Sequence, residues 1–287
     1  MKAVVAIDGS KQSQLITQNL KAFTPLDNIV LLNAYEVPQL GYPGTGMSVG
    51  HDFSVRAEET LRQEGNRILE EVLFQLPKDS GPIRRQLERG STAEVILAAA
   101  KQENADLIIM GSRGLGVIRE HALGSVSHHV STHASCTTFV AKNYCDSFQH
   151  ILIPLEQTTD AEQIVSFLST HPFRGTVKLT LLHVIPFAQP VLPVGALIPE
   201  SLINTMIEDS QQFTNTIATR LSSLGYVTAT VVKTGTPSIV IHEEAQRLAV
   251  NMILMQRHTK KKLSRFLLGS VSHSVVHHTT CSILLFQ

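Results

Sequence analysis

Three glycines and a serine at fixed spacing stand out in the first half of the chain. They form the motif Gly-x2-Gly-x9-Gly-Ser over residues 111–125, directly after a strand expected over residues 106–110. Glycine lets the backbone turn with a positive φ and approach a ligand without a Cβ in the way. A helix expected to begin near Gly124 would aim its unpaired N–H groups and its positive dipole end at such a ligand. Ser125 could cap that helix or bond a phosphate oxygen, and Arg113 could add a charge-assisted contact.

Asp8 also suggests chemistry, because it directly follows the strand expected over residues 2–7, which is apolar from Ala3 onward. In an open α/β sheet, ligands bind beyond the carboxyl ends of the strands, where the strand order reverses. Asp8 would lie in that crevice. It could also cap a helix expected over residues 11–22, and the two roles can coexist. The glycines alone are compatible with simple turns, but together with Ser125 and Asp8 they favour nucleotide binding.

The sequence repeats itself once. Residues 123–128, which read Leu-Gly-Ser-Val-Ser-His, recur at residues 268–273, an offset of 145 residues. The same offset aligns further glycine, methionine, histidine and cysteine positions, and a length of 287 residues suits roughly two domains. We therefore predict two copies of one domain, over residues 1–145 and 146–287.

Strand and helix signals alternate in each copy. The first expected strand is an almost continuous apolar run, which is typical of a strand buried on both faces, and the segment that follows it carries helical spacing. This alternation predicts an α/β fold with a five-stranded, doubly wound parallel sheet in each domain. The expected strands lie at residues 2–7, 29–34, 83–88, 106–110 and 137–141, and again at 150–155, 178–184, 227–233, 250–255 and 282–286. The longest expected helices lie at residues 54–76 and 200–224, the first after a Gly/Pro loop over residues 38–50.

With Asp8 after the first strand, the glycine motif after the fourth and two such copies, the chain resembles a tandem universal stress protein. The resemblance implies Rossmann-like domains, similar to the adenine nucleotide alpha hydrolases, that bind ATP, with or without Mg²⁺. It also implies that the last strands of the two halves, residues 137–141 and 282–286, pair across a pseudo-twofold axis. A further homodimer is left open.

Carried over position by position, the resemblance implies a set of nucleotide-binding residues. Those that would line the adenine and ribose pocket are Ala6, Ile7, Asp8 and Ala34. Those that would hold the ribose and phosphates are Met110, Gly111, Arg113, Gly114, Gly124, Ser125 and Val126.

The second copy departs from this pattern. Gln256 and Thr259 stand where the first copy has its first two glycines, and Glu156 replaces the aspartate. Side chains at these positions would occupy the space that a phosphate needs beside the backbone. The adjoining basic loop, residues 257–265, could bind an anion, but we favour a solvated loop. The sequence thus predicts one nucleotide site, in the first half.

Composition excludes several classes of protein. The 24 basic and 24 acidic side chains give no overall attraction to nucleic acid or an anionic membrane, and with no Trp and only four Tyr a base-stacking surface is not expected. No stretch approaches the roughly 20 apolar residues that a membrane helix needs. Cys136, Cys145 and Cys281 have no metal-ligand spacing, and we interpret them as small buried hydrophobes. We expect a soluble cytoplasmic protein with reduced thiols.

Histidines cluster near the end of each copy. His129 and His133, and likewise His273 and His277, are four residues apart, a spacing that suits two zinc ligands on one helix face. A helical wheel places the first pair beside Val126 and Val130 on the apolar face and the second pair on the opposite face. Because the pairs are not equivalent, we favour solvated or interface histidines and predict no metal site.

No catalytic triad, P-loop or carboxylate pair is evident, so at most slow ATP hydrolysis is expected. The favoured interpretation is an ATP-binding regulatory module of the stress response. The alternatives are a scaffold for partners with a vestigial nucleotide site and a binder of another small molecule or lipid. In the last case the apolar, Pro-rich residues 187–199 would cover a crevice in the second half.

Overall fold

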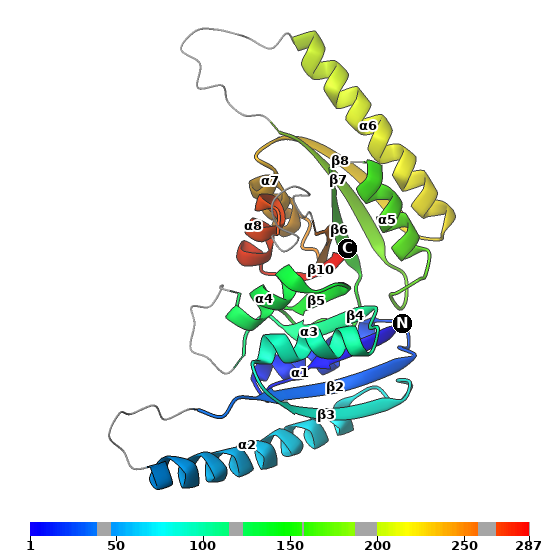
Figure 1. Ribbon diagram of the computed structural model, residues 1–287. Helices are drawn as coiled ribbons and strands as arrows, with labels where there is room; N and C mark the ends of the chain where they lie inside the picture. Colours follow the sequence, from blue (N-terminus) through cyan, green and yellow to red (C-terminus); the bar gives the residue numbers. More distant parts are fainter. Residues whose placement is uncertain (39–46, 115–122, 157, 187–199, 258–267, 287) are drawn as a thin grey trace, which may run out of the picture. The chain divides into compact units, whose positions relative to one another are not determined.

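The protein was analysed as a computed structural model (Figure 1). The structure describes residues 1–38, 47–114, 123–156, 158–186, 200–257 and 268–286. The chain divides into two compact units. Unit 1 contains Met1–Lys21 and Pro25–Asp146, and unit 2 contains Ala22–Thr24 and Ser147–Gln287. No helix in the described ranges is long and apolar enough to cross a membrane.

Unit 1 is built on a parallel sheet of five strands in the order β3-β2-β1-β4-β5. Its strands are β1 (Lys2–Ala6), β2 (Asn28–Tyr35), β3 (Ile83–Arg89), β4 (Leu107–Gly111) and β5 (Thr137–Ala141). Its helices are α1 (Lys11–Asn19), α2 (Met47–Gln75), α3 (Thr92–Gln102) and α4 (Ser125–His133), and a 3-10 turn follows α1 at Leu20–Ala22. Because β1 pairs with both β2 and β4, the strand order reverses beside β1.

The helices of unit 1 cover both faces of its sheet. Right-handed crossovers place α1 and α2 on one face and α3 and α4 on the other, and the members of each pair pack together (Figure 1). Strands β1, β2 and β4 are therefore largely buried on both sides, whereas the edge strand β3 has no buried residue. Val4, Ile108 and Ile109 are fully shielded from solvent, and each such side chain contributes about 1.5–3 kcal/mol of burial free energy.

Unit 2 has the same architecture, with the parallel strand order β10-β9-β6-β7-β8. Its strands are β6 (His150–Leu155), β7 (Lys178–Pro186), β8 (Val227–Gly235), β9 (Met252–Gln256) and β10 (Ser282–Phe286). Its helices are α5 (Thr158–Leu168), α6 (Glu200–Ser223), α7 (Pro237–Arg247) and α8 (Ser270–His278). The predicted fold class, two doubly wound α/β domains in tandem, is confirmed.

An aromatic cluster in unit 2 includes a residue from far upstream in the sequence. Phe23 is completely buried, and its ring centroid lies 5.2 Å from that of Phe148 and 5.8 Å from that of Phe173. Main-chain hydrogen bonds hold the segment in place: Thr24 N donates to Pro172 O, and Arg174 N donates to Ala22 O. The short segment 22–24 is thus an integral part of the core of unit 2.

Helix ends differ from the prediction more than strand ends do. Helix α2 begins at Met47, inside the loop expected over residues 38–50, because Gly50 weakens a long helix by only about 1 kcal/mol and does not end it. Helix α1 ends at Asn19 rather than at residue 22, since the last turn tightens into the 3-10 form. Within the loop expected over residues 38–50, residues 39–46 lie outside the described residues.

All three cysteines fall within the described residues. Cys145 and Cys281 are buried, Cys136 is half-buried, and all three carry thiols rather than a disulfide. The burial of two of them agrees with their interpretation as small core residues.

We expect Phe23→Ala to destabilise the protein by about 3–5 kcal/mol, because a large cavity would open in the aromatic cluster. Phe74→Ala is the matched control, since the Phe74 side chain is 89% exposed and should change stability by less than about 0.5 kcal/mol. Urea denaturation followed by circular dichroism measures both. Equal midpoints for the two variants would contradict the placement of Phe23 in a core.

His150 should make the stability of the protein depend on pH. Burial, followed by the charge of Lys178, lowers its pKa below the ordinary value of 6.5, and its Nε2 lies 2.8 Å from Thr180 Oγ1. The unfolded chain therefore takes up this proton at a higher pH than the folded chain does. The contribution of neutral His150 to stability is present above pH 6.5 and is lost as the pH falls through the lowered pKa.

We accordingly expect the free energy of unfolding to fall less steeply between pH 7.5 and pH 5 in His150→Gln than in the wild type. Urea denaturation at a series of pH values measures the two slopes. Parallel slopes would exclude His150 as a source of the pH dependence.

Candidate functional site

A cavity of about 440 Å³ opens in unit 1 at the point where the strand order reverses. Its walls come from the carboxyl ends of β1, β2 and β4, from α1 and α2, and from the first turn of α4. The volume is within the range of about 300–1,000 Å³ that is typical of small-molecule sites. All of the site residues expected from the sequence line it: Ala6, Ile7, Asp8, Ala34, Met110, Gly111, Arg113, Gly114, Gly124, Ser125 and Val126.

The glycines at and after the end of β4 are required by the close approach of two side chains. A Cβ on Gly114 would lie 2.6 Å from Asp8 Oδ2, and a Cβ on Gly111 would lie 2.9 Å from the Cβ of Gln12 on α1. Distances below 3.0 Å do not occur between real atoms of these kinds, so a side chain at either position would displace its neighbours. The backbone at these two positions can therefore pack against Asp8 and Gln12 because both residues are glycine.

The other expected reason for the glycines is wrong. Gly111, Gly114 and Gly124 do not have positive φ angles, whereas Gly9, at the turn after β1, has a φ of 76°. The lack of space for a Cβ at Gly111 and Gly114, and not a left-handed backbone conformation, explains why these residues are glycine.

Helix α4 starts at the floor of the cavity. Gly124 is its N-cap residue, so the expected capping role of Ser125 is wrong, and Ser125 is the first residue of the helix. Two hydrogen bonds to Ser112 O fix this end of the helix: Gly124 N donates at 2.8 Å and Ser127 Oγ donates at 2.8 Å. The first N–H groups of a helix have no partner within it and carry a partial positive charge. An anion is favoured at this end of the cavity, where Arg113 also lies.

Asp8 has a fixed orientation. Its Oδ1 accepts hydrogen bonds from Ser10 N at 3.0 Å and from Ser13 Oγ at 2.9 Å, and its own N–H donates to Ser13 Oγ at 3.0 Å. The N-cap of α1 is Ser10, so Asp8 bonds the residue at the cap position and is not itself the cap. Its carboxylate repels anions and accepts hydrogen bonds. The Asp8 carboxylate, which lies against Gly114, therefore suits hydroxyl or amino groups of a ligand.

Sequence reasoning missed several lining residues. Asn33 is buried and donates from Nδ2 to Ile7 O at 2.8 Å, and α2 approaches it so closely that a Cβ on Gly65 would lie 2.9 Å from Asn33 Oδ1. An asparagine inside an otherwise apolar strand was a signal for this position. Gln12 Oε1 is buried beside Gly111 and accepts no hydrogen bond from the described residues. Nothing in the local sequence pattern pointed to Gln12 or Gly65.

At the position equivalent to Gly111, unit 2 has a residue with a long side chain. Gln256, at the end of β9, takes the place of Gly111 and donates from Nε2 to Gln163 Oε1 of α5. Arg257, expected in a solvated loop, is only 4% exposed, and its N–H donates to Phe286 O at the end of β10. Thr259 and the rest of the basic loop, from residue 258 to residue 265, lie outside the described residues, as do residues 187–199.

The histidines of α4 do not lie on its buried face. The buried residues of the helix are Ser127, Val130, Ser131 and Thr132, whereas the side chain of His129 is 40% exposed. The helical wheel was wrong here because small serines, and not the larger histidines, pack against the sheet. His129 Nε2 instead lies 3.0 Å from a carboxylate oxygen of Glu94 on α3.

Both halves of the chain are similar to known proteins. The model of the Universal stress protein family matches residues 1–142 and again residues 147–287. A universal stress protein of Synechocystis sp. is 33% identical over 99 residues, which are 34% of this chain and 92% of that protein. One from Thermus aquaticus is 30% identical over 143 residues, 48% of this chain and 96% of its own.

Solved structures share the fold of the whole chain. The crystal structure of a universal stress protein from Archaeoglobus fulgidus has a TM-score of 0.61 and 19% sequence identity, and the match covers 100% of this chain and 96% of that one. A putative universal stress protein from Pseudomonas aeruginosa has the same TM-score, with 15% identity over 99% and 92% of the two chains. At these identities the likeness is one of fold.

The contacts of Asp8 predict a difference between two neighbouring serines. We expect Ser13→Ala to destabilise the protein by about 1–3 kcal/mol, because it removes the partner of the Asp8 N–H and a donor to its carboxylate. Ser10→Ala is the matched control, since the buried Ser10 Oγ has no hydrogen-bond partner among the described residues. Urea denaturation should show a change of less than about 0.5 kcal/mol for Ser10→Ala. Equal effects would mean that the contacts of Ser13 do not stabilise the site.

Proposed function

Because the chain belongs to the Universal stress protein family, we propose that unit 1 binds ATP in the cavity beside β1 and β4. The motif Gly-x2-Gly-x9-Gly-Ser over residues 111–125 would hold the nucleotide, and the protein would act as a binding module that regulates a stress response. Its nucleotide state would alter a conformation or a surface for a partner. The cytoplasmic location expected from the sequence stays a prediction.

The observation that carries this proposal is the convergence of the expected residues on one cavity that offers two kinds of polar group. The first turn of α4 and Arg113 favour an anion, and the Asp8 carboxylate favours hydrogen-bond donors. ATP has both kinds of partner, since its phosphates are anionic and its ribose carries hydroxyl groups. The N–H groups at the start of α4 support phosphates lying at this helix end.

The remaining lining suits the base and the sugar. Ala6, Ile7, Ala34 and Met110 give an apolar wall next to Asp8, where an adenine ring would be shielded from water. Gln12 Oε1 offers a buried acceptor to a ligand hydroxyl or amino group. Among the described lining residues, Arg113 is the single cationic side chain available to the phosphates. Mg²⁺ would therefore accompany the nucleotide as an additional counterion of its phosphates.

Hydrolysis in such a site would be slow. A general base must reach the attacking water, and one carboxylate oxygen of Asp8 already accepts two hydrogen bonds from Ser10 and Ser13. We therefore propose ATP binding with at most slow turnover. Binding of a different metabolite or lipid stays an alternative without a supporting observation, because residues 187–199 lie outside the described residues.

Unit 2 differs from unit 1 at the position that matters most for a phosphate. The hydrogen-bonded side chain of Gln256 stands where the close packing of unit 1 against Gln12 requires Gly111. We propose a single nucleotide site per chain, in unit 1. The pairing of residues 137–141 with residues 282–286 and the formation of a homodimer stay predictions.

We expect one molecule of Mg-ATP to bind per chain and Gly111→Gln to weaken this binding at least about tenfold, equivalent to ~1.4 kcal/mol. The substitution places in unit 1 the residue that unit 2 has at the same position. Gln256→Gly is the matched control and should leave the affinity unchanged. Isothermal titration calorimetry measures stoichiometry and affinity together.

Two outcomes of this titration would contradict the proposal. Absence of binding by the wild type would overturn ATP as the ligand. Wild-type affinity in Gly111→Gln, with loss in Gln256→Gly, would move the site to unit 2. Circular dichroism of both variants separates a change at the site from a failure to fold.

A further inference from the structure

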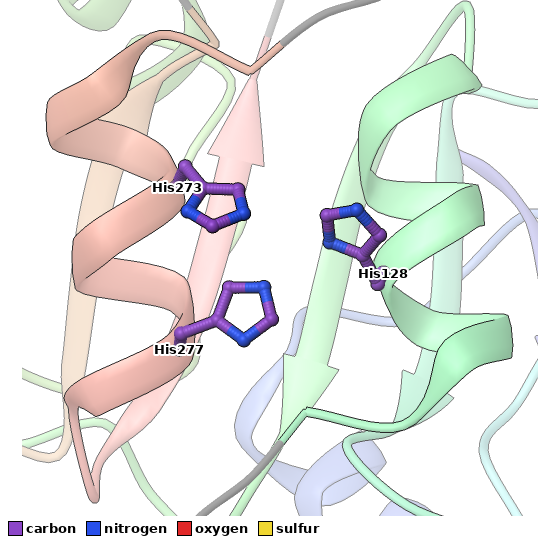
Figure 2. Close-up of side chains that lie close together, drawn as sticks. All are labelled: His128, His273 and His277. Carbon is purple, nitrogen blue, oxygen red and sulfur yellow. The ribbon is translucent and has the colours of Figure 1, made fainter.

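Two histidines lie one turn apart on the last helix of unit 2. His273 and His277 of α8 have ring centroids 4.4 Å apart and ring planes inclined at 32°. Figure 2 shows both rings projecting from the same side of α8, and it also draws His128 of α4. His273 is exposed and His277 is half-buried. Neither residue takes part in the cavity of unit 1.

The spacing of these rings suits a shared metal ion. Residues at positions i and i+4 lie above one another on a helix, and the ring nitrogens of His273 and His277 approach within 4.8 Å of each other. Two imidazole nitrogens bound to one tetrahedral Zn²⁺ with bonds of about 2.0–2.1 Å are roughly 3.3 Å apart. Small rotations about the side-chain bonds of an exposed histidine close this difference.

The position on the helix adds an electrostatic preference. Helix α8 ends at His278, so His277 lies in its last turn. The carbonyl groups at a helix C-terminus carry a partial negative charge, which stabilises a nearby cation. Imidazole is a ligand for Zn²⁺, Cu²⁺ and Ni²⁺, whereas Mg²⁺ and Ca²⁺ prefer oxygen ligands.

The other closely spaced histidines are arranged differently. On α4, the rings of His129 and His133 are stacked at 4.1 Å with planes only 19° apart. The lone pairs of an imidazole lie in the ring plane, so those of nearly parallel rings run side by side and do not converge. His129 Nε2 also contacts Glu94, and His133 Nδ1 lies 2.8 Å from His129 O. On α8, His278 Nδ1 similarly lies 2.8 Å from Ser274 O.

We propose that His273 and His277 form a bidentate site for a divalent transition-metal ion of the Zn²⁺ class. One nitrogen of each imidazole would coordinate the ion, and water would fill the remaining positions. The inference changes the prediction from the sequence, which assigned no metal site to these residues. It is independent of ATP binding, because it involves a different unit and different residues.

The test is a titration of tag-free, full-length protein with Zn²⁺ in the absence of nucleotide, followed by calorimetry. We expect His273→Ala and His277→Ala each to weaken one Zn²⁺ site at least about tenfold. His278→Ala, on the same helix, and His129→Ala, on α4, are matched controls and should retain the wild-type affinity. Mg²⁺ in place of Zn²⁺ should show no binding at this site.

Substitution by cysteine distinguishes a lost ligand from a disturbed helix. Cysteine also binds Zn²⁺, so His277→Cys should restore affinity that His277→Ala loses. The proposal is overturned if the wild type does not bind Zn²⁺, or if the double variant His273→Ala/His277→Ala binds it as the wild type does. Equal losses in His278→Ala and His277→Ala would also overturn it.

Discussion

The candidate site depends on a single constraint, the close packing of the backbone at the end of β4 against Asp8 and against Gln12 of α1. The strand order places the carboxyl ends of β1 and β4 side by side, because β1 pairs with β4 on one edge and with β2 on the other. The packing leaves no room for a Cβ at Gly111 or Gly114. With both glycines in place, Asp8, Gly114 and the first turn of α4 line one cavity.

The two units show what happens to the same fold without this constraint. Strand β9 ends as β4 does, but Gln256 fills the position beside it with a side chain that hydrogen-bonds to α5. The sheet and its helices are unaffected, because the residues that stabilise the fold are the apolar residues of the strands and not the loop at their ends. A side chain at this position therefore alters the end of the strand and not the core that stabilises the unit.

Much of the fold was predictable from the sequence, for a physical reason. Strands buried on both faces appear as continuous apolar runs, so β5, β6 and β10 lie at the residues expected. The part of the candidate cavity that the glycine motif over residues 111–125 lines was predictable from that motif. Contacts between distant segments were not predictable. Glu94 contacts His129, which is 35 residues away in the sequence, and Gly65 of α2 lies close to the side chain of Asn33 on β2. The spacing of residues along the sequence does not indicate which distant residues form such pairs.

The segment 22–24 has a consequence for the order in which the chain is made. Phe23 leaves the ribosome early, but Phe148 and Phe173, which complete its surroundings, follow about 125 and about 150 residues later. At about 5–20 residues per second, the exposed ring waits on the order of 6–30 s for the rest of its core. During that interval the nascent first half carries a large apolar side chain without the residues that bury it in the folded protein.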